Sequence, residues 1–253
     1  MDFSGAVKRA WSYSLDAKRF GTMLAMLLIA FVIAVAPIFF IYKTFSLGLL
    51  NVFTLIQSFA LLLVGIIIGV LILLYATLLF THNYANKKSL GASARFALSN
   101  YPKFLAVVIV SGLVSWIVGF VPFIGIILSI AAGLIFFFVQ QEVGARKSSF
   151  SDSLTNSYRL FMNNKLDTII AMIITAVLSL IIIIIFAIPI LAVLFGALGA
   201  ALTGGSFTAV LAANIGALVV SAVMLVIGLA FATLFSNSIK TDIFMQMIKN
   251  RKR

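Results

Sequence analysis

The most concentrated group of chemically capable side chains is Gln140, Gln141 and Glu142, directly after a long apolar run. A carboxylate at the end of a membrane span is costly to bury unless a cation or hydrogen-bond donors accompany it. The chain contains a repeated pattern, described below, in which an amphipathic helix precedes a pair of spans. We expect Glu142 to pair with a basic residue of a neighbouring repeat. This pair would fix how the amphipathic helices pack on the bundle. Direct contact of Glu142 with a ligand is the alternative.

Other residues give no sign of catalysis or metal binding. His82 is the only histidine and the chain has no cysteine, so a transition-metal site would depend on carboxylates that are scattered along the sequence. Serines are frequent, but none belongs to a recognisable Ser-His-Asp motif, and no Gly-Lys-Ser or Gly-Lys-Thr phosphate loop occurs. We therefore predict a protein that is not an enzyme and needs no metal or cofactor.

The elements that hold these residues are membrane spans. Hydrophobic residues make up 63% of the 253 residues, charged residues make up 9%, and the mean hydropathy is +1.23. Several apolar runs exceed the roughly 20 residues that a transmembrane helix needs. We predict six helical spans, at 21–42, 51–80, 104–121, 124–139, 167–194 and 208–235.

Few polar groups interrupt these spans. No charged residue or histidine lies well within them, so ion-coupled transport has no evident coupling group. Gln57, Ser58, Trp116 and Asn214 could line a cavity, but hydrogen bonds between helices are the commoner role of such residues.

The charges of the chain are strongly one-sided. Every Lys and Arg except Lys43 precedes span one, follows span six, or lies between spans two and three or four and five. The positive-inside rule therefore predicts a multi-pass protein of the plasma (inner) membrane with both termini in the cytoplasm.

A helical pattern precedes each odd-numbered span. One helix face carries Phe150, Leu154, Tyr158, Phe161 and Met162. The spacing recurs, in full and then in shortened form, at Phe3, Val7, Trp11 and Leu15 and at Leu90, Ala94, Leu98 and Tyr101. We predict an all-α, polytopic membrane protein: a single transmembrane domain, 1–253, of three helical hairpins, each preceded by a cytoplasmic amphipathic helix. The pseudo-threefold repeat has units of about 3–82, 89–144 and 149–238 and a basic tail, 239–253. Similar loops in unrelated hairpins are the alternative explanation.

The amphipathic helices are predicted at 3–17, 89–101 and 149–164, and the tail is predicted as a fourth. On the membrane surface their basic residues would meet anionic headgroups while the aromatic residues enter the acyl boundary. Packing on one another or on a partner protein is the alternative. The residues expected to contact lipid or a partner are Lys8, Arg9, Lys18, Arg19, Lys87, Lys88, Arg95, Lys103, Arg146, Lys147, Arg159 and Lys165.

Prolines and glycines mark the expected ends and close contacts of the spans. Pro122 predicts a tight reversal between spans three and four, and Pro37 and Pro189 are expected to close the outer ends of spans one and five. The glycine-rich stretch 196–205 predicts a flexible or re-entrant outer connection. Gly65 and the glycine four residues later form a GxxxG motif, which permits close approach of helix backbones.

The stretch QQEVGARKSSFSDSLTNSYRLFMNN, which begins at Gln140, follows the fourth of six spans. Together with the basic helix before each odd span, it resembles six-span prokaryotic membrane proteins, including archaeal ones and the membrane domain of some glycerophosphoryl diester phosphodiesterases. The resemblance is strongest over residues 130–170 and implies a prokaryotic, archaeal membrane module. The catalytic domain of those phosphodiesterases is not present, so their activity is not implied.

Two functions fit these patterns. The favoured hypothesis is a non-enzymatic membrane scaffold or accessory subunit that engages anionic lipids, partner proteins or further copies of itself through its basic helices. The alternative is a transporter or channel-forming subunit for an apolar or polyanionic substrate, including nucleic acid drawn to the basic face. The predicted spans lack a basic lining, so the charge explains attraction of a polyanion but not its passage.

Overall fold

A computed structural model describes residues 1–46 and 52–251, and over these ranges the chain is helical without strands. The helices are α1 (Phe3–Ser14), α2 (Ala17–Ser46), α3 (Val52–Asn86), α4 (Leu90–Gly119), α5 (Gly125–Ile135), α6 (Val139–Arg146), α7 (Phe150–Asn163), α8 (Lys165–Leu202), α9 (Phe207–Ala213) and α10 (Ile215–Arg251). Six stretches, in α2, α3, α4, α5 with α6, α8 and α10, are long and apolar enough to cross a membrane. The prediction of an all-α multi-pass membrane protein is confirmed.

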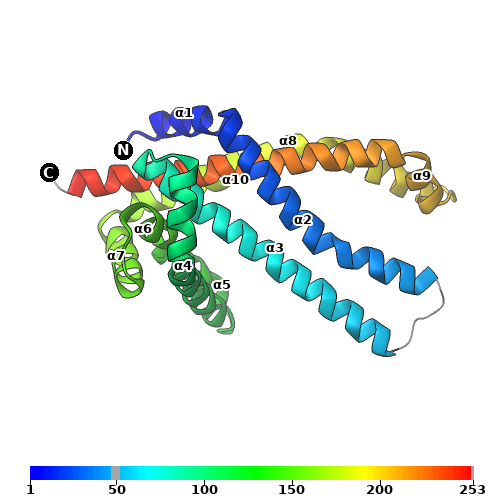
Figure 1. The fold of residues 1–253 in the computed structure, drawn as a ribbon, viewed down its shortest axis with the longest axis horizontal. Helices are drawn as coiled ribbons and strands as arrows, with labels where there is room; N and C mark the ends of the chain where they lie inside the picture. Colours follow the sequence, from blue (N-terminus) through cyan, green and yellow to red (C-terminus); the bar gives the residue numbers. More distant parts are fainter. Residues whose placement is uncertain (47–51, 252–253) are drawn as a thin grey trace.

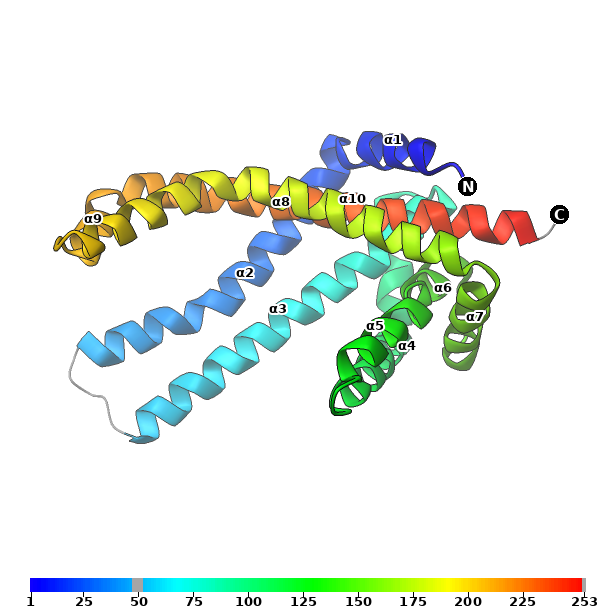
Figure 2. The ribbon, with the colours of Figure 1, turned by 180° about the vertical axis from the view of Figure 1, so that it is seen from behind.

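Long helices pack in sequential pairs and diverge from one end of the molecule. The most extensive contacts join α2 to α3 and α8 to α10, and α4 also packs on α5. Figure 1 shows the termini, α1, α6 and α7 gathered at one end, from which the pairs extend in different directions. From behind, α8 follows α10 along most of its length (Figure 2). We call the gathered region, made of α1, the end of α3, the start of α4, α6, α7 and residues 231–251 of α10, the basic end.

The hydrophobic core is concentrated at the basic end. The largest fully buried side chains include Phe80, Phe104, Phe138, Phe235 and Phe244. They come from α3, α4, the α5–α6 connection and α10, so α10 joins the other elements through residues 226–247. Outside this core the long helices expose most of their apolar side chains, as lipid-facing helices do.

Two of the three prolines expected to end spans lie inside helices instead. Pro37 lies within α2 and Pro189 within α8, so the expectation that they close these spans is wrong. A membrane helix tolerates proline because neighbouring groups satisfy the freed carbonyl. Pro122 does lie in the turn between α4 and α5, as predicted, and the Gly125 backbone passes so close to Gly119 that a Cβ would clash with the Gly119 carbonyl oxygen.

Two other connections also differ from the prediction. Stretch 196–205 is helical as far as Leu202, so the outer connection is shorter than predicted and leads into α9. The fourth span, predicted at 124–139, breaks into α5 and α6 around Phe138, which is fully buried. This break turns α6 against α3, and tertiary packing rather than a proline accompanies it.

The amphipathic segments form helices with different connections to the spans. α1 and α7 are separate helices, whereas segment 89–101 continues directly into α4 and the predicted tail helix is the end of α10. Asp2 and Ser149 are the N-caps of α1 and α7, because their side chains accept hydrogen bonds from backbone N–H groups in the first turns of these helices. The predicted start of span two at Asn51 and the side chain of Lys43 lie outside the described residues.

The GxxxG glycines lie at the contact between α2 and α3. A Cβ on Gly65 would lie 2.7 Å from the Ile33 carbonyl oxygen, and one on Gly69 would lie 3.1 Å from that of Ala30. The close backbone approach that the motif predicts is therefore present.

Candidate functional site

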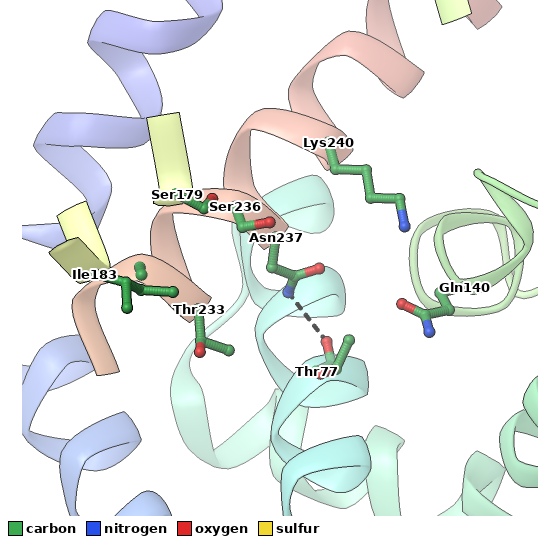
Figure 3. A pocket seen from close by; sticks show the side chains of 9 residues that line it. Thr77, Gln140, Ser179, Ile183, Thr233, Ser236, Asn237 and Lys240 are labelled. Carbon is green, nitrogen blue, oxygen red and sulfur yellow. Dashed lines mark hydrogen bonds between the residues drawn. The ribbon is translucent and has the colours of Figure 1, made fainter. Parts of the chain in front are cut away.

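A polar cavity of about 300 Å³ lies between four helices at the basic end. Its lining comes from α3, α6, α8 and α10 and consists of Thr77, Gln140, Ser179, Ile183, Ala232, Thr233, Ser236, Asn237 and Lys240. Figure 3 shows the α10 side chains directed toward the space that Gln140 and Thr77 border from the other side. Hydroxyl, amide and ammonium groups therefore converge where the apolar spans begin.

Lys240 is the cation of this cavity. Its ammonium lies 4.4 Å from the centre of the Phe137 ring, in a cation–π contact. Among the described residues it forms no ion pair, although Asp242 is only two positions away and pairs with Arg9 instead. The lining thus carries a positive charge without a carboxylate to balance it.

Asn237 joins three helices beside the cavity. Its side-chain oxygen accepts hydrogen bonds from Thr81 at 3.0 Å and from the Gln141 amide at 3.5 Å. Its amide donates to the Thr77 carbonyl oxygen at 3.2 Å. Because Thr81 and Gln141 are fully buried, Asn237 holds α3, α6 and α10 together and shapes the cavity wall.

Two buried polar atoms near the cavity lack partners in the described part of the chain. The hydroxyl of Ser179 and the side-chain oxygen of Gln141 have no hydrogen-bond partner. Ser179 itself lines the cavity and lies beside Ser236 of α10 in Figure 3. A buried hydroxyl without a partner is costly, so this wall can accommodate a polar ligand or water.

Glu142 has a different partner from the one expected. It is 1% exposed, and its carboxylate accepts hydrogen bonds from Arg146 at 3.2 Å and from the Ser148 hydroxyl at 2.8 Å. Arg146 is four residues away on the same helix, so the expectation of a partner in another repeat unit is wrong. Local groups pair with the Glu142 carboxylate because α6 is short and ends at Arg146. Lys147 has a left-handed conformation, which turns the chain so that the Ser148 hydroxyl lies next to Glu142.

A second polar cluster attaches α1 to α10. The Arg9 guanidinium binds Asp242 at 2.7 Å, and Asp242 also accepts hydrogen bonds from Tyr84 and Gln246. The bond with Asp242 raises the pKa of Arg9, and burial raises the pKa of Tyr13, whose hydroxyl donates to Asn83. The backbone N–H of Gly5 lowers the pKa of Asp2. This cluster is structural: it ties the N-terminus to the last turns of the chain.

The predicted contact residues remain accessible in most cases. Arg19 and Lys103 are half-buried, and the other ten basic residues are exposed. Of the twelve, Arg9, Arg19 and Arg146 form ion pairs with carboxylates of the described residues. The helices and loops that carry these twelve residues meet at the basic end. The twelve residues are distributed around this end and do not line one pocket.

His82 packs as an internal residue. Its ring stacks on Phe96 with centroids 3.9 Å apart, and its Nδ1 lies 3.2 Å from the Ser93 hydroxyl. Over the described residues, no group of three or more His, Cys, Asp or Glu side chains could hold a metal ion.

The cavity was not predicted from the sequence, although α10 carries a signal for it. Thr233, Ser236, Asn237 and Lys240 follow the spacing i, i+3, i+4 and i+7, which is one polar stripe on a helix. The prediction ended span six at residue 235 and assigned Lys240 to a surface tail, so the stripe was divided. No family model, curated protein or solved structure matches the chain.

Proposed function

We propose that the protein is a non-enzymatic membrane scaffold or accessory subunit of the plasma (inner) membrane, with both termini in the cytoplasm. Its basic end engages anionic lipid headgroups and helps to hold partner proteins or further copies of the chain. The proposal is supported by the meeting of the basic elements at one end, since the positive-inside rule assigns such an end to the cytoplasm.

The main support for the proposal is the surface of α7. Its inner side packs on the bundle through Ser153, Ser157 and Leu160, and the Ser157 hydroxyl donates to the Ile135 carbonyl oxygen at 2.7 Å. Its outer side leaves Phe150, Tyr158 and Met162 exposed at 39, 45 and 43%. At a bilayer interface these apolar groups enter the acyl boundary instead of water.

Basic residues accompany this apolar face. Arg159 lies on α7 itself, and Lys147 and Lys165 flank the helix; all three are exposed. A basic residue near an anionic leaflet contributes on the order of 1 kcal/mol of attraction. Apolar insertion and headgroup attraction together favour an α7 that lies flat on an anionic membrane.

We also propose that the three units derive from one repeated design. Each unit begins with an amphipathic segment at the basic end, and the long helix that follows packs on a second one. The basic helix before each odd span is also the feature that resembles six-span prokaryotic membrane proteins. A relationship to those proteins is part of this proposal.

The lipid environment of purified protein tests the scaffold proposal. In nanodiscs of mixed phosphatidylcholine and phosphatidylglycerol, the variant K147Q/R159Q/K165Q should lose enrichment of phosphatidylglycerol around the protein by several-fold. Proteins that copurify from gently solubilised membranes should be lost in parallel. The matched control K147R/R159K/K165R keeps the three exposed positive charges at the same positions and should behave like the wild-type protein. Equal effects of the two variants, or no effect of the α7 variant, would contradict the proposal.

A further inference from the structure

We propose that the cavity around Lys240 is a binding site for one anionic amphiphile: a lipid whose phosphate headgroup meets Lys240 while a hydrocarbon chain follows α10 outward. The inference goes beyond the surface binding proposed above, because the cavity uses none of the α7 residues. Either idea can fail while the other holds.

The headgroup half of the site follows from charge and unmet hydrogen bonding. The Lys240 ammonium lacks a carboxylate among the described residues, and the Ser179 hydroxyl in the same cavity lacks a partner. Ser236 and Gln140 add a hydroxyl and an amide to the same lining (Figure 3). A phosphate accepts hydrogen bonds from all of these donors and neutralises the lysine.

The chain half of the site is an apolar groove that begins beside the cavity. A space of about 310 Å³ lies between α2, α3 and α10, and its lining includes Leu27, Phe31, Leu73 and Leu229. Thr233 lines both the groove and the polar cavity. Polar and apolar compartments that share one wall residue match a ligand with a polar head and an apolar chain.

The position of the two compartments along the helices agrees with the orientation of a lipid. On α10 the lining runs from Lys240 through Asn237 and Thr233 to Leu229, away from the basic end. On α3 it runs in the same sense, from Thr77 to Leu73 and then to Ile66. Lys240 therefore lies on the side of the basic end, and the groove extends from it along the apolar part of the spans.

Native mass spectrometry of the full-length protein in detergent tests the site. We expect wild-type protein to retain one phosphatidylglycerol in preference to phosphatidylcholine, and K240Q to bind phosphatidylglycerol about tenfold more weakly, as the loss of one charge-assisted contact implies. K240R should keep most of the binding. K249Q is the matched control, because Lys249 is an exposed lysine on the same helix. An affinity of K240Q within twofold of that of K249Q would overturn the proposal.

A second pair of measurements separates a lipid from a free anion. L229W fills the apolar groove and should weaken phosphatidylglycerol binding several-fold, whereas millimolar inorganic phosphate should not displace the lipid. Full displacement by phosphate, together with no effect of L229W, would show a simple anion site and would overturn the amphiphile assignment. If K240Q does not fold, a photoreactive phosphatidylglycerol should label residues 179–183 and 229–240 in the wild-type protein, and labelling elsewhere would count against the site.

Discussion

The basic end and the far ends of the long helices are held by different interactions. At the basic end, buried polar groups such as Asn237, Thr81 and Gln141 bond across three helices, and aromatic side chains fill the core. At the far ends, side chains such as Phe53 on α3 and Leu202 on α8 are 75 and 80% exposed. Specific contacts therefore determine the fold at one end, whereas the far ends depend on lipid as their neighbour.

Of the substitutions that test this comparison, removal of the Asn237 side chain should reduce the free energy of unfolding most. Asn237→Ala leaves the Thr81 hydroxyl, the Gln141 amide and the Thr77 carbonyl without their partner, and we expect a loss of about 2–3 kcal/mol in the free energy of unfolding. Unfolding in detergent, followed by circular dichroism, measures it.

Asn214→Ala is the matched control, because Asn214 is exposed and, within the described ranges, its side chain bonds only to the Val210 carbonyl of the preceding turn. It should cost less than about 0.5 kcal/mol. Similar costs for the two variants would mean that the basic end is not the more specifically packed region.

A methyl group added to Gly144 should have an intermediate effect. The Cβ of Gly144→Ala would lie 2.5 Å from the Thr81 Cγ2, and Thr81 is held by its bond to Asn237. We expect a loss of about 1–2 kcal/mol, typical of overpacking in a core. Gly133→Ala on α5 has nothing within 4 Å of its new methyl and should be neutral or slightly stabilising. A neutral Gly144→Ala would show that α6 is free to move from α3.

The smallest of the expected effects is the weaker docking of α1 on α10 at acidic pH. The lowered pKa of Asp2 means that its cap supports α1 above the unfolded pKa, and that this support is lost as the pH falls below about 4. Trp11 packs edge-on against Phe231 and Phe235, so its fluorescence in a W116F background reports the docking of α1 on α10. Asp2→Asn keeps a capping side chain without the charge and should remove this part of the acid response. An unchanged response in the variant would assign the acid transition to other groups.

The sequence predicts the number and the approximate positions of the spans, because hydrophobic length determines them, but the predicted sixth span, 208–235, joins α9 to the start of α10 and ends before α10 does. It also predicts the turn at Pro122 and the close approach at Gly65, where single residues have a local mechanism. It fails for Pro37 and Pro189, because membrane helices tolerate proline, and for the break before α6, which depends on the packing of Phe138. The cavity escapes prediction because its wall comes from four helices that meet only in the folded chain.

The most direct test of the account is the position of α7 relative to the membrane. The chain has no cysteine, so single-cysteine variants need no further change. In inverted membrane vesicles, a membrane-impermeant maleimide should label Arg159→Cys, while Tyr158→Cys should be protected and a nitroxide there should report contact with lipid. In right-side-out vesicles neither position should react. Labelling of both positions from the outside, or equally fast labelling of both as in a helix free in water, would contradict a basic, half-apolar helix on the inner leaflet.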